Sequence, residues 1–213
     1  MITAAEALER LRAGNQRFVA ALGAGGAAAP RPIALVAQQE PIAIVLGCSD
    51  ARVPAEIVFD QGLGDLFVIR VAGNIVAPSQ IGSVEFAAER FGTRLVVVLG
   101  HTSCGGVLAT LEALRDPGTR TSPGLRSIVD RIRPAIEGLF AAGAGRPQAE
   151  LVREAVRANV RASVRRLRRG SRILERLGER DGLVIVGAEY SLESGRVEFL
   201  DALPAEPVAD PRR

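Results

Sequence analysis

The apolar residues of the chain fall into a few continuous runs, separated by stretches that alternate between apolar and polar positions. Two runs, residues 42–46 and 95–99, are wholly apolar, rich in Ile and Val, and each is followed by glycine. Such runs are typical of strands buried on both faces of a parallel sheet. Further strands are expected at 66–71 and 183–187, with an edge strand at 196–200.

The stretches between the strands have the periodicity of amphipathic helices. These helices are expected at residues 3–22, 79–91, 107–115, 125–142 and 148–169. Thr3 and Glu6 have the spacing of a capping box at the start of the first helix. The sequence therefore predicts an α/β fold in which a central, mostly parallel β-sheet is flanked by helices.

Charge and cysteine content narrow the class of protein. The net charge is +3, and all 27 basic residues are arginine, which indicates codon bias more than an acidic partner. Two cysteines without a signal sequence argue against a disulfide framework. No apolar stretch approaches membrane-spanning length. We therefore expect a cytoplasmic protein without a membrane partner.

The most distinctive side chains follow the two apolar runs. Cys48 and Asp50 come directly after the first run, and His101 and Cys104 come after the second. Because ligands of parallel sheets bind beyond the carboxyl ends of the strands, these residues should meet at one edge. Two thiolates, an imidazole and a carboxylate suit zinc, and three protein ligands with an open position are typical of a catalytic site.

The alternative is that these residues have no chemical role. A lone histidine is often a satisfied core residue, and a buried cysteine often acts as a small hydrophobic side chain. The chain has one histidine and two cysteines. A randomly placed histidine would fall within three residues of a cysteine on the order of one time in twenty. The metal site is therefore the preferred interpretation.

Two segments resemble the signatures of the β-class carbonic anhydrases. They are Cys-Ser-Asp-Ala-Arg-Val-Pro at 48–54 and Gly-His-Thr-Ser-Cys-Gly-Gly at 100–106. The resemblance extends over most of the chain and includes Ala-Gly-Asn at 72–74 and Ala-Asn-Val-Arg at 158–161. It implies reversible hydration of carbon dioxide to bicarbonate and a proton, through attack of a zinc-bound hydroxide.

The resemblance also implies a role for each matched residue. Cys48, His101 and Cys104 would hold zinc, and Asp50 would be a further ligand in a closed form of the site. In the open form, Arg52 would pair with Asp50. The Asp50 carboxylate would then accept a hydrogen bond from the hydroxide and orient it.

Substrate contacts are expected from Gln39, Phe67, Phe86 and Gly105. Gln39 has the spacing of a glutamine that reaches the neighbouring subunit's metal site in plant-like relatives, although a surface role is equally compatible. Phe67 is favoured as a core residue over a pocket residue, and Phe86 stands where plant-like relatives carry tyrosine. Gly105 follows Cys104 and opens a helix whose amides would stabilise a thiolate.

A bicarbonate-stabilised closed form is less expected. Relatives with that form use a Trp-Arg-Tyr triad, and Arg70 and Tyr190 match two of its positions, but Val45 replaces the tryptophan. We therefore expect the open form of the site at neutral pH.

The chain is expected to have three parts. Residues 1–32 would form an N-terminal helical arm with a linker, residues 33–203 the α/β zinc-binding catalytic domain, and residues 204–213 a flexible tail. In β-class carbonic anhydrases the N-terminal helices pack on a neighbouring subunit. The resemblance therefore implies a homodimer or a dimer of dimers.

Two other functions remain open at this point. Some relatives use the same fold and ligands to hydrolyse carbonyl sulfide or carbon disulfide. A non-enzymatic zinc or Arg-rich interaction protein is the other alternative, and its contact surface would be an arginine stripe at positions 153, 157, 161, 165 and 168. Without interleaved aromatic residues, a solvated helix face or ion pairs are favoured over nucleic-acid binding.

Overall fold

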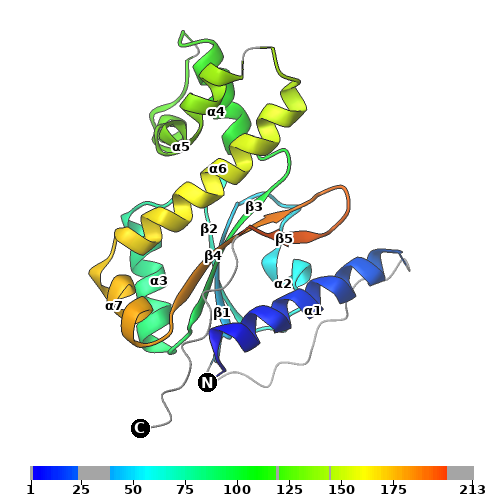
Figure 1. Cartoon of the computed structure of the whole chain (residues 1–213), viewed down its shortest axis with the longest axis vertical. Helices are drawn as coiled ribbons and strands as arrows, with labels where there is room; N and C mark the ends of the chain where they lie inside the picture. The colour runs from blue at the N-terminus through cyan, green and yellow to red at the C-terminus, as the bar shows by residue number, and fades with distance from the viewer. Residues whose placement is uncertain (1, 24–38, 119, 144, 201–213) are drawn as a thin grey trace.

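A computed structural model describes residues 2–23, 39–118, 120–143 and 145–200 (Figure 1). Within these ranges the chain forms a five-stranded sheet of order β2-β1-β3-β4-β5. Its strands are β1 (Ala43–Gly47), β2 (Leu66–Arg70), β3 (Leu95–His101), β4 (Val184–Tyr190) and β5 (Val197–Phe199). Strands β1 to β4 are parallel, and β5 is antiparallel to β4. The predicted fold class is confirmed.

Helices cover both faces of the sheet. The helices of the described residues are α1 (Ala4–Gly23), α2 (Ala55–Val58), α3 (Pro78–Arg90), α4 (Gly105–Arg115), α5 (Pro123–Ala142), α6 (Gln148–Arg169) and α7 (Arg172–Arg180), with a 3-10 turn η1 (Ala72–Asn74). Helices α3, α6 and α7 lie on one face, and α1 and α2 lie on the other (Figure 1). None of these helices is long and apolar enough to cross a bilayer.

Alternate residues of the central strands enter different cores. Val45 and Val97 pack with α1 and α2, whereas Ile44 and Val98 pack with α3, α6 and α7. Every residue of β1 and β3 is buried. The two strands therefore need apolar side chains at consecutive positions, which explains the continuous runs in the sequence.

A further core lies beyond the carboxyl ends of the strands. There, helices α4 and α5 pack against the first half of α6, and Cys48 and Cys104 belong to the same cluster of buried side chains. Ile132 and Ile136 of α5 are fully buried in it. The apolar side chains of this core therefore cover the carboxyl ends of the strands.

Helix α1 packs on the sheet of its own chain. Leu8 and Leu11 are fully buried against strand residues. The predicted capping box is confirmed, because Glu6 N donates to Thr3 Oγ1 at 3.2 Å and Thr3 N donates to Glu6 Oε2 at 2.7 Å. Within one chain the predicted arm does not stand apart from the core, and its packing on a partner stays a prediction. The predicted linker from residue 24 and the predicted tail lie outside the described residues.

Asn15 is a polar anchor between α1 and the rest of the fold. It is 6% exposed, and its Nδ2 donates to Val58 O at 2.9 Å and to Gly195 O at 3.0 Å. Its Oδ1 accepts a hydrogen bond from Val197 N at 3.0 Å. One side chain thus joins α1, α2 and the start of β5.

Replacing this anchor should destabilise the protein. Asn15→Ala would leave main-chain groups of Val58, Gly195 and Val197 without partners, and we expect it to lower the free energy of unfolding by about 2 to 4 kcal/mol. Urea denaturation at fixed protein concentration measures the loss. The exposed neighbour provides a control, since Gln16→Ala should change stability by less than about 0.5 kcal/mol. Equal effects of the two substitutions would contradict the anchoring role.

Candidate metal centre

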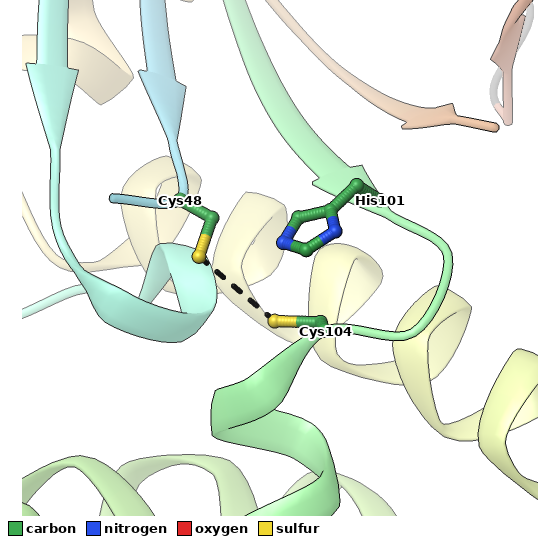
Figure 2. Close-up of side chains that lie close together, drawn as sticks. All are labelled: Cys48, His101 and Cys104. Carbon is green, nitrogen blue, oxygen red and sulfur yellow. Dashed lines mark hydrogen bonds between the residues drawn. The ribbon is translucent and has the colours of Figure 1, made fainter. Parts of the chain in front are cut away.

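The candidate metal centre lies where β1 and β3 end. These strands are parallel neighbours, and Gly47 is in register with Leu99. Cys48, which follows β1, and His101, the last residue of β3, therefore emerge at the same edge. Cys104 comes directly before α4, after a turn in which Ser103 has a φ of 56°. Figure 2 shows the three side chains converging from these three segments.

The ligand atoms form a compact, buried group. Cys48, His101 and Cys104 are 5%, 0% and 1% exposed, and their ligand atoms all lie within 4.8 Å of one another. The sulfur atoms of Cys48 and Cys104 are 4.0 Å apart (Figure 2). Two thiolates bound to one tetrahedral zinc at about 2.3 Å would be about 3.8 Å apart. The observed spacing therefore fits zinc.

The imidazole of His101 has the orientation of a metal ligand. Its Nδ1 lies 2.9 Å from the carbonyl oxygen of Thr102, to which the Nδ1–H donates. The lone pair is then on Nε2, which is buried and has no hydrogen-bond partner. Such a main-chain partner commonly orients a metal-binding histidine, and an unpaired buried acceptor is costly without a ligand.

The two thiols influence each other's ionisation. The hydrogen bond from Cys104 lowers the pKa of Cys48, and the main-chain N–H of Gly73, 3.3 Å from the Cys48 sulfur, adds to this effect. The same hydrogen bond raises the pKa of Cys104, and burial raises it further. A bound cation would remove this opposition, because it stabilises both thiolates.

Asp50 borders the ligand group and pairs with Arg52. Arg52 Nε donates to Asp50 Oδ1 at 2.9 Å, and Nη2 donates to Oδ2 at 2.7 Å. These bonds hold the pKa of Asp50 well below its usual range. Asp50 Oδ2 is 3.9 Å from His101 Nε2, but the carboxylate is not among the three clustered ligand atoms.

Arg70 fastens the loop that carries Cys48 and Asp50. Its Nε donates to Cys48 O at 3.0 Å, and its Nη2 donates to Asp50 O at 2.5 Å. The resemblance implies a different role for Arg70, as one member of the Trp-Arg-Tyr triad of relatives with a bicarbonate-stabilised closed form. The other two matched positions, Val45 and Tyr190, are buried on the face that α1 and α2 cover.

The predicted substrate-contact residues are dispersed in a single chain. Gly105 is the first residue of α4 and adjoins Cys104. Gln39 is exposed and precedes β1, so it lies at the opposite end of that strand from Cys48. Within one chain, therefore, Gly105 adjoins the ligand group and Gln39 does not.

Phe67 and Phe86 belong to an aromatic cluster away from the strand ends. Phe67 pairs with Ile44 in the sheet, three residues before β1 ends. Its ring centroid is 6.2 Å from that of Phe86 and 6.0 Å from that of Phe91. Phe86 is 53% exposed. The contact of Phe67 and Phe86 with substrate stays a prediction.

The arginine stripe of α6 is partly used inside the chain. Arg157 Nε pairs with Glu189 at 2.7 Å, and its Nη2 pairs with Glu198 at 2.5 Å. Arg168 donates to Ile185 O at 2.5 Å. These contacts join α6 to β4 and β5, in agreement with the preference for ion pairs over nucleic-acid binding.

Gly73 contacts the site, although the sequence patterns assign it no role there. It supplies a main-chain donor to Cys48, as described above, from the turn η1. Gly73 and Asn74 both have positive φ, 68° and 42°. Glycine and asparagine tolerate this conformation best, so the Gly-Asn pair is the sequence signal of the turn.

Comparisons with known proteins agree with this geometry. A sequence model of the family described as carbonic anhydrase matches residues 43–197. The chain is 40% identical over 196 residues to carbonic anhydrase 2 of Mycobacterium tuberculosis, covering 92% of each chain. It is 42% identical over 198 residues to a carbonic anhydrase of Mycolicibacterium smegmatis, covering 91% of each. A tetrameric β-carbonic anhydrase from Sordaria macrospora has the same fold, with a TM-score of 0.71, 24% identity, and coverage of 79% of this chain and 84% of that one.

Zinc binding should depend on both sulfur atoms. Cys104→Ser removes one thiolate, and we expect it to weaken zinc binding by more than about 100-fold, so that purified protein no longer holds one zinc per chain. Metal analysis and competition with a chromophoric chelator measure this. Ser49→Ala, next to Cys48 but exposed, is the control and should keep its zinc. Full zinc content in Cys104→Ser would show that the metal lies elsewhere.

Proposed function

The chain belongs to the β-class carbonic anhydrase family, and we propose how its residues carry out that family's reaction, the reversible hydration of carbon dioxide to bicarbonate and a proton. The proposal is supported above all by the buried Cys48, His101 and Cys104 group, in which His101 Nε2 is left unpaired beside Asp50. Zinc held there would act as a Lewis acid: it would lower the pKa of water toward neutrality and so make hydroxide available as the nucleophile.

Asp50 orients the nucleophile. Its carboxylate stays ionised because Arg52 lowers its pKa, so it accepts a hydrogen bond from hydroxide and does not take the proton. The hydroxide is then held with a lone pair free to attack the carbon of carbon dioxide. Arg52 has the positioning role, since its two-pronged contact keeps the carboxylate beside the three ligands and not among them.

The substrate contacts come from a homodimer or a dimer of dimers. Strand β2 is at an edge of the sheet, and Phe67, on this strand, packs with the half-exposed Phe86. Pairing of two chains along this edge would cover the aromatic cluster and bring Phe67, Phe86 and Gln39 of one chain toward the other chain's site. Oligomer formation in the similar Sordaria macrospora structure supports this arrangement.

The cytoplasm is the proposed location. Both cysteines are free and buried at the site, and they must remain reduced to bind metal. Hydrolysis of carbonyl sulfide or carbon disulfide is not favoured, because the mycobacterial relatives that match over nine-tenths of the chain are named carbonic anhydrase. A non-enzymatic role is not favoured for the same reason.

Stopped-flow measurement of carbon dioxide hydration by the zinc-loaded protein tests this function, and Asp50→Asn tests the role of the carboxylate. The amide loses the charge that accepts the hydroxide's hydrogen bond, so we expect kcat/KM to fall about 100-fold with zinc retained. The control is Asp60→Asn, which makes the same chemical change in another ion pair, between Asp60 and Arg17 of α1. It should leave the rate unchanged. Absence of hydration by the unmodified protein at any pH from neutral to alkaline would refute the function.

Turnover should be limited by buffer at neutral pH. The chain has one histidine, and His101 is committed to the metal, so no imidazole is free to carry the product proton away. We expect kcat to rise and then saturate with increasing concentration of a buffer that titrates near neutrality, while kcat/KM stays constant. A kcat that ignores buffer concentration would point to a proton path through other groups of the protein.

A further inference from the structure

The segment between β2 and α3 touches a metal ligand through its main chain. Gly73, in the turn η1, donates its N–H to Cys48 Sγ in a buried hydrogen bond of 3.3 Å. Two successive residues with positive φ, Gly73 and Asn74, shape the turn. The direction of this N–H therefore depends on a backbone conformation that few sequences adopt without support.

Helix α6 holds this turn through two side-chain hydrogen bonds to its main-chain carbonyls. Asn159 Nδ2 donates to Gly73 O at 2.8 Å, and Ser163 Oγ donates to Asn74 O at 3.0 Å. Asn159 is 2% exposed and Ser163 5% exposed. Asn74 N also donates to Val71 O at 2.9 Å. The two peptide groups that follow Gly73 are thus held in place, directly after the residue whose N–H reaches the sulfur.

Close packing leaves the turn no room on the side of α4 and α5. A Cβ atom on Gly73 would lie 2.7 Å from Ile132 Cδ1, and a Cβ atom on Gly106 would lie 3.0 Å from Gly73 Cα. Both distances are shorter than ordinary contact. The turn therefore sits against α4 and α5 on one side, and Asn159 and Ser163 of α6 hold its main chain by hydrogen bonds.

We propose that Asn159 is a positioning residue of the metal centre, which keeps the Gly73 N–H on the Cys48 sulfur and so sets how strongly that sulfur donates to the metal. A hydrogen bond draws electron density from a thiolate, and such bonds to ligand sulfur tune metal centres. A sulfur that donates less leaves the metal a stronger Lewis acid. The consequence for catalysis rests on the proposed function, and the consequence for metal binding does not.

Three measurements on Asn159→Leu and Asn159→Ala test the proposal. Leucine has a similar size but cannot donate, and alanine removes the side chain if leucine prevents folding. We expect zinc affinity to fall about 10- to 100-fold, because the turn no longer holds the Cys48 sulfur in position and this loss outweighs the stronger donation of the sulfur. In the cobalt-substituted protein, the sulfur-to-metal charge-transfer band should move to lower energy because the sulfur lone pair is less stabilised. The pH midpoint of carbon dioxide hydration should move to a more alkaline value.

Ser163→Ala is the matched control. It removes a hydrogen bond from α6 to the same turn, one residue further from the sulfur, so it should lower the melting temperature of the metal-free protein without moving the cobalt band. If the Asn159 variants keep the zinc affinity and cobalt band of the unmodified protein, the proposal is wrong. If Ser163→Ala changes both to the same extent, the role of Asn159 is structural and the proposal is also overturned.

A measurement on the unmodified protein does not depend on any variant folding. In the cadmium-loaded protein, scalar coupling between the metal nucleus and the Gly73 amide proton should be observed through the Cys48 sulfur. Its absence would overturn the proposal. A protein that binds cobalt or cadmium but does not hydrate carbon dioxide would refute the proposed function alone, and the cobalt band and the coupling would still decide the role of Asn159.

Discussion

The parallel pairing of β1 with β3 is the constraint on which the rest of the site depends. The register that sets Gly47 beside Leu99 also brings Cys48 and His101 to the same edge of the sheet. Both strands are buried on their two faces, so polar ligands have no place within them and can lie only where the strands end. A slip of one residue in either strand would turn its ligand to the opposite face.

Burial of two cysteine ligands places demands on the surrounding main chain. Without a cation, the hydrogen bond with Cys48, burial and the charge on Cys48 raise the pKa of the Cys104 thiol. Among the groups that stabilise Cys48, the Gly73 N–H is a neutral dipole. Neutral donors stabilise a thiolate without cancelling its charge, so they favour the ionised form while leaving the attraction for a metal cation intact.

The strands, the long helices and the ligand group could be predicted because each has a local signal. Helix α7 is not among the helices predicted from the sequence; it is short, and its start depends on Ser171, whose Oγ accepts from Leu174 N at 3.1 Å. Asn159 could not be assigned to the site, because its partner is a main-chain carbonyl 86 residues away. The roles of Gln39 and Phe86 stay predictions for another reason, since they depend on a second chain.

Asp50 pairs with Arg52 and is not among the three clustered ligand atoms, and charge balance favours this arrangement. Two thiolates would neutralise the charge of a divalent zinc held there, so the centre would attract a carboxylate weakly. Arg52, by contrast, carries a full positive charge and makes a two-pronged contact with both carboxylate oxygens. Arg70 holds the main chain of the same loop through the carbonyls of Cys48 and Asp50, so a move of Asp50 onto the metal would require this contact to change as well. Two arginines at the rim thus hold Asp50 beside the three clustered ligand atoms, one acting on the side chain and one on the backbone.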